Sequence, residues 1–387
     1  MTIVTTIEDL RRVAKRRVPR MFYDYCDSGS WTESTYRANE DDFAGIKLRQ
    51  RVAVDMSDRS LATTMAGQAV AMPVALAPTG LTGMQRADGE ILAARAAEAA
   101  GVPFTLSTMS ICSIEDVAEH ATKPFWFQLY FMRDRAFNER LIDRAQAAGC
   151  SALVLTLDLQ ILGQRHKDIR NGLSAPPRFT AATVLDLMTK PRWCWHMLRT
   201  RRRTFRNIVG HVEGVADTRS ISAWTAQQFD PRLDWDDVRR IRDRWKGPLI
   251  LKGVLDVEDA VRAAETGAQS LVVSNHGGRQ LDGAPSSIAV LPEIADAVGH
   301  RIEVLMDGGI RSGQDVLKAV ALGAKGVFVG RPFLYGLGAY GGPGVTLCLD
   351  IIRRELDMTM ALCGRRDIRD VDRSILRAPP LSNHPGW

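Results

Sequence analysis

The segment SNHGGRQLDG, residues 274 to 283, places a histidine, two glycines and an arginine within four positions. An imidazole titrates near neutral pH, so His276 could act as a general base. Gly277 and Gly278 leave room for backbone to approach a ligand, and the forked guanidinium of Arg279 suits a carboxylate. A lone histidine at a strand end is usually structural, but a base beside an anion clamp predicts a catalytic site for an acidic small molecule.

Three further charged residues end or follow apolar runs and could complete this site. Asp158 ends the run LVLTLD, where burial is costly without a positive or hydrogen-bonding partner. His276 could be that partner, and Asp158 would then stabilise the imidazolium formed during proton abstraction. Arg165, in GQRHKD, could be a second carboxylate clamp. Lys252 ends PLILK with no carboxylate nearby in the sequence, which favours an anionic cofactor as its partner.

Eight short, apolar and β-branched runs alternate with helical stretches such as DGEILAARAAEAAG and GQDVLKAVALGA, a pattern that indicates parallel strands with crossover helices. The predicted strands are PVALA from Pro73, PFTLS from Pro103, FWFQLY from Phe125, ALVLTL from Ala152, PLILK from Pro248, SLVVS from Ser270, IEVLM from Ile302 and GVFVG from Gly326. Eight such units predict an α/β fold of the (β/α)8 TIM-barrel type. A doubly wound sheet would ordinarily carry a dinucleotide-type glycine loop after its first strand.

The glycine-rich turns follow the last two predicted strands instead of the first. MDGGIRSG comes after the seventh strand and VGRPF after the eighth. Barrels commonly bind phosphate at this place through backbone N–H groups and a helix N-terminus. Arg311 and Arg331, which lie beside the two turns, would complete a phosphate site.

Polar residues gather at the C-terminal ends of the predicted strands. In a parallel barrel these ends converge on one face, so residues far apart in the sequence would line one pocket. The residues at or just past these ends are Thr79, Ser107, Gln128, Tyr130, Thr156, Asp158, Lys252, Ser274, His276 and Asp307.

The alternation predicts one domain over residues 1–387, built around the barrel. Its expected parts are an N-terminal cap (1–70), the barrel (71–158 and 248–340), an active-site loop or insertion after the fourth strand (159–247), and C-terminal helices and tail (341–387). A long insertion at the catalytic face usually has a function of its own.

Composition excludes several other classes of protein. The chain has 387 residues, 45% of them hydrophobic, which is enough for a full core. Its six cysteines are scattered without metal-ligand spacing, so we expect no metal site and reduced thiols. The first 22 residues lack the apolar region of a secretory signal and predict an amphipathic surface helix. No apolar run approaches the roughly 18 residues of a membrane span.

The net charge of +6 belongs to one segment. Residues 187 to 209 contain seven basic and no acidic side chains, together with Trp193, Trp195 and Phe205. Without these seven basic residues the formal charge would be −1. The segment could be a solvated lid packed on the barrel or on another subunit, or it could bind an anionic membrane surface. We expect no nucleic-acid partner, because the segment is one short basic run with no nucleic-acid-binding fold around it.

Taken together, these motifs resemble the FMN-dependent 2-hydroxy acid oxidases and dehydrogenases, which include glycolate oxidase and the bacterial L-lactate and mandelate dehydrogenases. The resemblance runs from about Asp9 to Arg377 and is carried by SNHGGRQLDG with YDYCDSG, ALAPTGLTGM, TLST, WFQLY, LTLD, LKGV, DGGIRSGQDV and GRPFLY. Met109 stands where the plant-type oxidases have a tryptophan, and Gly80 where they have an alanine. Both positions are more similar to the bacterial L-lactate dehydrogenases.

The resemblance implies a role for each matched residue. His276 would be the base, Asp158 its stabilising carboxylate, and Arg165 with Arg279 the pair that holds the substrate carboxylate. Tyr25 and Tyr130 would face the substrate with their hydroxyls, and Lys252 would lie beside the flavin N1 and O2 edge. The implied FMN-binding residues are Pro78, Thr79, Gly80, Ser107, Gln128, Thr156, Lys252, Ser274, Asp307, Gly308, Gly309, Arg311, Gly330 and Arg331.

The implied reaction is oxidation of L-lactate, an (S)-2-hydroxy acid, to pyruvate, with electrons passed from FMN to a quinone or cytochrome. The bacterial dehydrogenases of the family are peripheral membrane enzymes, which implies attachment to the cytoplasmic side of the inner membrane through residues 187–209. A soluble cytoplasmic enzyme is the alternative location. Tetramers are usual in the family. Alternative functions are an oxygen-using oxidase that forms hydrogen peroxide, a dehydrogenase for mandelate or another 2-hydroxy acid, and a flavin-binding barrel without catalysis.

Overall fold

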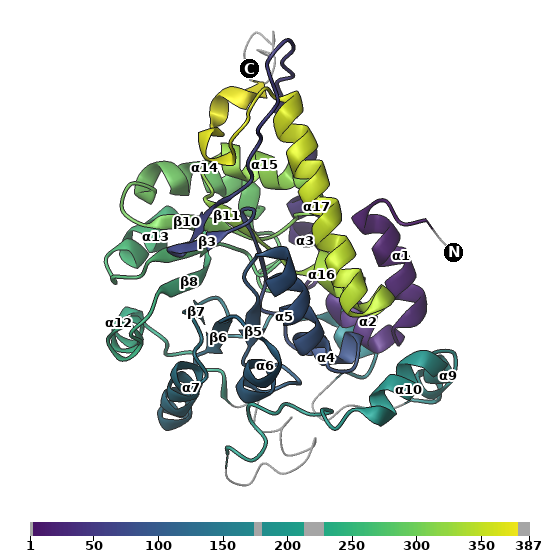
Figure 1. The fold of residues 1–387 in the computed structure, drawn as a ribbon. Coiled ribbons are helices and arrows are strands. Elements are labelled where there is room, and N and C mark those ends of the chain that lie inside the picture. The colour runs from purple at the N-terminus through teal and green to yellow at the C-terminus, as the bar shows by residue number, and fades with distance from the viewer. Residues whose placement is uncertain (1–2, 174–179, 213–227, 378–387) are drawn as a thin grey trace, which may run out of the picture.

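A closed ring of parallel strands forms the centre of the computed structural model, which describes residues 3–173, 180–212 and 228–377 (Figure 1). The strands are β4 (Val74–Leu76), β5 (Thr105–Ser107), β6 (Trp126–Tyr130), β7 (Ala152–Thr156), β8 (Leu249–Val254), β9 (Ser270–Val273), β10 (Glu303–Met306) and β11 (Gly326–Val329). Each strand pairs in parallel with the next, and β11 pairs with β4. A parallel bridge between Leu76 and Phe104 joins β4 to β5 and closes the ring. The predicted (β/α)8 barrel and its eight strands are confirmed.

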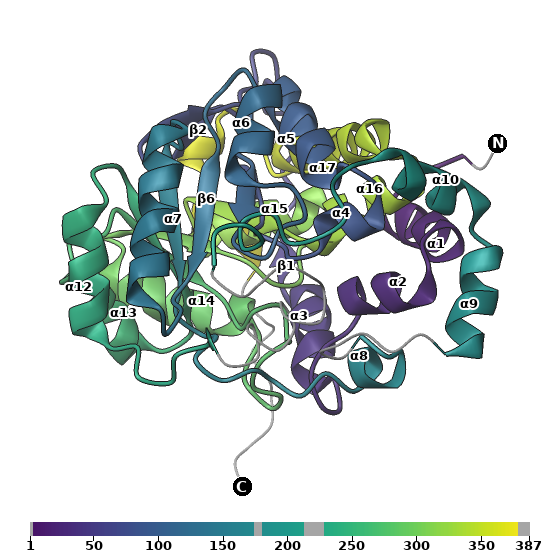
Figure 2. The same cartoon turned by 90° about the horizontal axis from the view of Figure 1, so that it is seen from below.

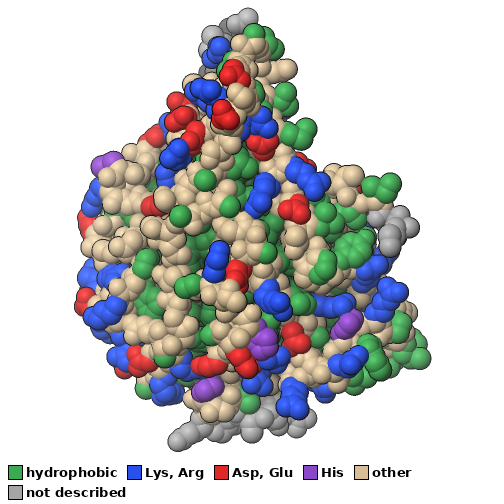
Figure 3. Space-filling model, viewed as in Figure 1, with side chains coloured by type: hydrophobic (Ala, Val, Ile, Leu, Met, Phe, Trp, Pro, Cys, Tyr) green, Lys and Arg blue, Asp and Glu red, His purple; other side chains and the backbone are tan. Residues whose placement is uncertain are grey.

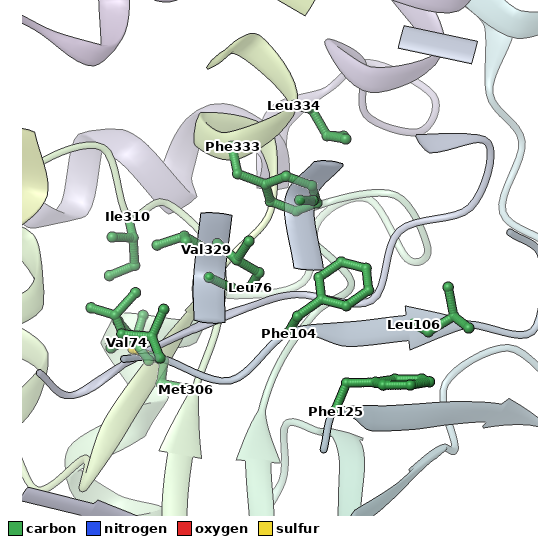
Figure 4. Packing of buried hydrophobic residues seen from close by; sticks show 14 of the residues in the cluster. Val74, Leu76, Phe104, Leu106, Phe125, Met306, Ile310, Val329, Phe333 and Leu334 are labelled. Atoms are coloured by element: carbon green, nitrogen blue, oxygen red, sulfur yellow. The ribbon is translucent and has the colours of Figure 1, made fainter. Parts of the chain in front are cut away.

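Helices follow the strands in sequence and surround the barrel, as the two views show (Figures 1 and 2). They are α5 (Gly89–Ala100), α6 (Ile114–His120), α7 (Arg135–Ala147), α12 (Trp235–Arg244), α13 (Val257–Ala264), α14 (Ser287–Val298), α15 (Gly313–Ala321), α16 (Arg331–Tyr340) and α17 (Gly342–Leu362). Figure 4 shows Phe333 of α16 beside Val329 and Leu76, where the helix packs on the strands. Burial of such apolar faces against the sheet is the main force that holds this layer in place.

Side chains fill the barrel interior, so the barrel is a packed core and not a pore. Trp126, Val154 and Phe328 are fully or almost fully buried there. The antiparallel hairpin β2 (Thr63–Met65) and β3 (Gln68–Val70) contributes Met65 to the same cluster. The indole N–H of Trp126 donates to the side-chain oxygen of Gln68 at 3.0 Å, at the start of β6. The hairpin therefore closes the N-terminal end of the barrel and leaves the opposite end for the site.

The N-terminal cap consists of α1 (Ile7–Arg17), α2 (Arg20–Cys26) and α3 (Ser34–Gly45). Helix α1 begins with a capping box, in which the Thr6 hydroxyl accepts from the Asp9 amide and the Asp9 carboxylate accepts from the Thr6 amide. Its apolar face is buried and its basic residues lie outward, so the predicted amphipathic surface helix is confirmed.

One buried carboxylate, that of Asp27, ties the cap to the barrel. It accepts hydrogen bonds from the hydroxyls of Tyr23 (2.8 Å), Tyr36 (3.1 Å) and Tyr335 (2.7 Å), and it pairs with Arg11 at 3.0 Å. Although burial opposes ionisation, the Tyr335 hydrogen bond and the Arg11 charge lower the pKa of Asp27 to about 2. The ionised Asp27 therefore fastens α1, α2 and α3 to α16.

The long connection between β7 and β8 contains α8 (His166–Arg170), α9 (Ala181–Met188) and α10 (Pro191–Arg199) before the barrel helix α12. Figures 1 and 2 agree that α9 and α10 lie beside α2, and the indole N–H of Trp193 donates to the Met84 carbonyl at 2.8 Å. Trp193 also stacks on Phe22, with 5.4 Å between ring centroids. No helix in the described part of the chain is long and apolar enough to cross a membrane.

The remaining elements are short. They are α4 (Thr82–Gln85), the 3₁₀ helices Ile368–Asp370 and Arg373–Ile375, and the antiparallel pair β1 (Lys47–Leu48) and β12 (Leu376–Arg377). The β1–β12 pair joins the end of the cap to the end of the described chain.

Candidate active site

A histidine–carboxylate pair lies at the mouth of the barrel. His276 follows β9 and Asp158 follows β7, and Nδ1 of His276 is 2.9 Å from Oδ1 of Asp158. His276 has a φ of +58°, a conformation that few side chains other than Gly and Asn adopt readily. A Cβ at Gly253 would lie 2.6 Å from Cγ of Asp158, so β8 needs a glycine at this point. The structure thus brings together the two residues proposed as base and stabilising carboxylate.

The environment of the pair keeps His276 ready to accept a proton. Burial disfavours the imidazolium and lowers the pKa of His276 below its ordinary 6.5, although the Asp158 charge opposes this effect. Although burial opposes ionisation, the interaction with His276 and then the Lys252 charge lower the pKa of Asp158 below its ordinary value, so Asp158 is ionised. An ionised carboxylate can only accept a hydrogen bond, so Nδ1 of His276 must carry the proton and donate it to Asp158. The lone pair of Nε2 is then available to act as a base.

Two arginines lie next to each other on the same face. Arg165, just before α8, donates from Nε to the Arg279 carbonyl at 3.5 Å, and the Arg279 guanidinium lies 4.7 Å from the centre of the Tyr25 ring. Burial and the Arg279 charge lower the pKa of Arg165 to about 10. Neither guanidinium forms an ion pair with a carboxylate in the described residues. The buried Asp168 acts on both arginines only at longer range. Two adjacent cations that form no ion pair within the described residues make a site that an anionic substrate would stabilise.

Two tyrosine hydroxyls complete the substrate side of the mouth. Tyr130 ends β6 and is buried, with its ring edge-on to Phe229 at 5.9 Å. Burial, and then the neighbouring Tyr25, raise the pKa of Tyr130 above its ordinary value, so its hydroxyl stays protonated and can donate. A Cβ at Gly80 would lie 3.0 Å from the Tyr25 hydroxyl and 3.3 Å from Cβ of Met109. Gly80 therefore leaves space between Tyr25 and Met109.

A buried lysine occupies the floor of the mouth. Lys252 Nζ pairs with Oδ2 of Asp307 at 2.9 Å and donates to the Ser274 hydroxyl at 3.0 Å. The strand was predicted to end at Lys252, whereas β8 continues to Val254 with an irregularity after Lys252. No carboxylate lies near Lys252 in the sequence, but Asp307, which follows β10 and lies 55 positions further along the chain, reaches it in the fold.

The predicted polar residues of β5, β6 and β7 form a connected row. The Ser107 hydroxyl donates to Oε1 of Gln128 at 2.9 Å, and Nε2 of Gln128 donates to the Thr156 hydroxyl at 3.0 Å. Thr79, by contrast, is hydrogen-bonded to Thr82 (2.6 Å between hydroxyl oxygens). The structure therefore unites the side chains of these three strands and Lys252 at one end of the barrel.

The two glycine turns lie where the sequence placed them, but their arginines have protein partners. Gly308 and Gly309 have φ angles of +96° and +82°, and a Cβ at Gly309 would overlap the Asn39 carbonyl. Arg311 pairs with Glu40 at 2.7 Å, and Arg331 donates to the carbonyls of Cys26, Ser28 and Gly277. Gly330 and Arg331 begin α16, so their backbone amides lie at the positive end of a helix.

Two positioning residues in the segment SNHGGRQLDG were not identified from the sequence. Nε2 of Gln280 donates to the carbonyls of Asp158 (2.6 Å) and Ile161 (2.8 Å), which fixes the loop that carries Asp158. The Asp282 carboxylate accepts from the amides of Thr32 and Thr35, which fixes the cap over the mouth. Their only signal was their place in the same decapeptide as His276.

A (β/α)8 barrel with a histidine–carboxylate pair at its mouth, beside two arginines that form no ion pair in the described residues, is an enzyme fold with a site for an anionic substrate. The chain belongs to the FMN-dependent dehydrogenase family, whose model matches residues 14–378. It is 48% identical to the L-lactate dehydrogenase of Caulobacter vibrioides, over 97% of this chain and 98% of that protein. It is 46% identical to the L-lactate dehydrogenase of Pectobacterium atrosepticum, over 95% of this chain and 96% of that protein.

A solved structure agrees with this assignment. The structure described as the monotopic membrane protein (S)-mandelate dehydrogenase superposes with a TM-score of 0.93 at 36% identity, and covers 98% of this chain and 100% of that one. The resemblance inferred from the motifs is confirmed. The protein is an FMN-dependent 2-hydroxy acid oxidoreductase.

The barrel mouth fits FMN. Lys252 uses two of its three N–H donors within the protein, so one remains for a ligand. Asp307 Oδ1 is buried and has no hydrogen-bond partner in the described residues, and a ribityl hydroxyl would supply one. The backbone N–H groups of Gly330 and Arg331, at the start of α16, suit a phosphate.

Proposed function

We propose that the protein oxidises L-lactate to pyruvate and passes the electrons to a quinone or cytochrome. The observation that carries the proposal is the His276–Asp158 pair, which lies on the same face as Arg165 and Arg279, two arginines that form no ion pair in the described residues. The full-length similarity to L-lactate dehydrogenases supports lactate as the substrate.

In the proposed reaction, Arg165 and Arg279 hold the lactate carboxylate and the Tyr130 hydroxyl donates to the 2-oxygen. Lactate loses two electrons and two protons. Nε2 of His276 takes one proton, and the two electrons with the second proton would go to bound FMN. Asp158 holds the ring through Nδ1 and stabilises the imidazolium. Bound FMN supplies the two-electron acceptor. Loss of the α-hydrogen as a proton and its transfer as a hydride both need this base.

We also propose which residues hold the cofactor. Lys252 would face the flavin N1 and O2 edge, where its positive charge favours the reduced anion. The remaining FMN-binding residues are proposed to be Pro78, Thr79, Gly80, Ser107, Gln128, Thr156, Ser274, Asp307, Gly308, Gly309, Arg311, Gly330 and Arg331. Since the guanidiniums of Arg311 and Arg331 have protein partners, the phosphate would be held chiefly by backbone amides.

Anaerobic flavin bleaching tests the substrate. We expect L-lactate to bleach the bound flavin with a higher second-order rate constant than glycolate, (S)-mandelate or longer 2-hydroxy acids, and D-lactate, the matched control, to leave it oxidised. Oxidation of (S)-mandelate is the second candidate, which the structural similarity to mandelate dehydrogenase favours. Faster bleaching by mandelate would establish that candidate, and hydrogen peroxide formed in proportion to pyruvate would establish an oxidase.

The second part of the proposal is that α9 and α10 contact an anionic membrane surface on the cytoplasmic side. Val184, Leu185, Met188, Trp195 and Leu198 are 50% to 74% exposed, which is unusual for such large apolar side chains. They lie in or beside the basic segment, and the combination of apolar and basic groups suits a lipid interface.

Vesicle cosedimentation tests this contact. We expect Leu185→Ser, Met188→Ser, Trp195→Ser and Leu198→Ser together to abolish pelleting with phosphatidylglycerol vesicles, because their apolar area no longer enters the interface. Met358→Ser with Leu362→Ser, on α17, is the control, since these two residues are also exposed (63% and 57%). Equal pelleting of both variants and the unmodified protein would reject the contact. The tetramer and the identity of the acceptor stay predictions.

A further inference from the structure

A second cavity, with a volume of about 540 Å³, lies between α1, α4, α10 and α16, apart from the barrel mouth. Its basic lining residues are Arg16, Arg17, Arg86, Lys190, Arg192 and His196. Arg16, Arg17 and Arg192 also line an adjoining hollow at the edge of α17. Figure 3 shows Lys and Arg side chains gathered on this side of the molecule. No lining residue in the described part of the chain is acidic.

Most of these positive charges have no counterion within residues 3–173, 180–212 and 228–377. The side chains of Arg16, Arg86 and Arg192 form no hydrogen bond or ion pair with a described residue. Arg17 donates to a backbone carbonyl, that of Ala339. Lys190 donates to the Arg16 carbonyl at 2.9 Å, and its nearest carboxylate oxygen, on Asp186, is 3.9 Å away.

The neighbouring positive charges lower the pKa values of two lining groups. Burial, and then the Arg17 charge, lower the pKa of Arg86. Burial, and then the charges of Arg86 and Arg199, lower the pKa of His196. The folded protein therefore holds cations together at a cost, which a bound anion would offset.

Two arginines of the same connection that lie outside the cavity are neutralised by carboxylates. Arg202 pairs with Asp88 at 3.1 Å and with Asp116 at 2.9 Å, and Arg206 pairs with Asp116 at 2.7 Å. The guanidiniums of Arg86 and Arg192, by contrast, have no partner among the described residues. The contrast indicates that these two arginines bind an anionic ligand that is not part of the protein chain.

We propose that this cavity binds the phosphate of an organic phosphate, presented either by an anionic phospholipid headgroup or by a soluble phosphate ester. Guanidiniums from α1, α10 and the end of α4 offer several N–H donors to one tetrahedral anion. The volume exceeds that of a bare phosphate and accommodates the attached organic group. Tyr340 and Trp193 supply aromatic walls.

The lipid source is favoured by the surroundings of the cavity. α10, which carries Arg192 and His196 into it, also presents Trp195 and Leu198 to solvent. A headgroup held in the cavity would leave its acyl chains next to these apolar side chains. In this form the inference rests on the membrane contact proposed above, and it adds a specific headgroup site to that contact.

A pair of charge-matched double variants tests the cavity. Arg86→Gln with Arg192→Gln removes two cations of the lining that have no partner in the described residues. Arg95→Gln with Arg201→Gln removes two exposed cations outside the cavity, of which Arg201 belongs to the same basic segment. The probes for the holoenzyme are glycerol 3-phosphate, by titration calorimetry, and vesicles of phosphatidylcholine with or without phosphatidylglycerol. We expect the cavity variant to lose about 10- to 30-fold in affinity for phosphatidylglycerol vesicles, and the control variant clearly less.

Each outcome separates the sources. Loss of vesicle affinity in the cavity variant supports the lipid source, and loss of glycerol 3-phosphate binding with unchanged vesicle binding supports a soluble ester. Equal vesicle affinities of the two variants, without glycerol 3-phosphate binding to the unmodified protein, would overturn the proposal. Bleaching by L-lactate is expected to be the same in both variants, so failure of this site is distinguishable from failure of the proposed activity.

Discussion

We expect His276→Ala to lower the rate of flavin reduction by L-lactate about 10⁴-fold while FMN stays bound, because the base in contact with Asp158 is removed. Stopped-flow bleaching measures the rate, and the flavin absorbance of the purified variant measures occupancy. His276→Asn is the matched variant: Asn tolerates the positive φ at this position and can still donate to Asp158, but it cannot accept a proton at neutral pH. Near-normal reduction in either variant would refute the assignment.

The pH dependence follows from the same geometry. Because burial holds the pKa of His276 below 6.5, the base form predominates at neutral pH. The rate of reduction is therefore expected to be constant near pH 7 to 8 and to fall below about pH 6.5 as His276 becomes protonated. The Asp158 charge raises the pKa of His276, so Asp158→Asn should move this fall to lower pH and reduce the plateau rate about 100-fold. A plateau unaffected by Asp158→Asn would exclude stabilisation of the imidazolium.

The architecture and the His276–Asp158 pair were predictable from the sequence for one physical reason. Parallel strands must place their C-terminal ends on one face, so a histidine after one strand and an aspartate after another become candidates for contact. The structure places their side chains 2.9 Å apart. Helical and β-branched periodicities were strong enough to locate all eight strands.

What the sequence could not supply were partners set by register or by packing. The Lys252–Asp307 ion pair depends on how far β8 and β10 extend. Asp27 lies in the motif YDYCDSG, but its role could not be predicted, because its four partners come from separate parts of the cap and from α16.

The basic segment is a second case in which the sequence did not predict the partners of individual side chains. Its residues read as one patch in the sequence, yet Trp193 and Met197 pack inward while Trp195 and Leu198 face solvent. Arg206 forms an ion pair with Asp116, whereas Arg192 forms no ion pair with a described residue. Periodicity along one helix cannot predict which of these side chains are buried, exposed or paired, because their partners lie on α2, α4 and α6.

The second large effect is expected at Arg165. Arg165→Met should lower kcat/KM for L-lactate about 100- to 1000-fold, mainly through a higher KM, because the substrate carboxylate is bound in the ground state as well as in the transition state. Steady-state kinetics with an artificial electron acceptor measure both parameters. Arg170→Met is the control, since Arg170 carries the same charge on the same loop but is exposed.

Stability separates this role from a structural one. The pKa of Arg165 is lowered to about 10, first by burial and then by Arg279, so the folded protein disfavours its charge. A neutral methionine of similar length should therefore leave the melting temperature unchanged or raise it when substrate is absent. A structural arginine would behave in the opposite way, and Arg165→Met would then melt earlier with little change in KM. A large rise in KM without loss of stability is the combination that a substrate-binding arginine alone predicts.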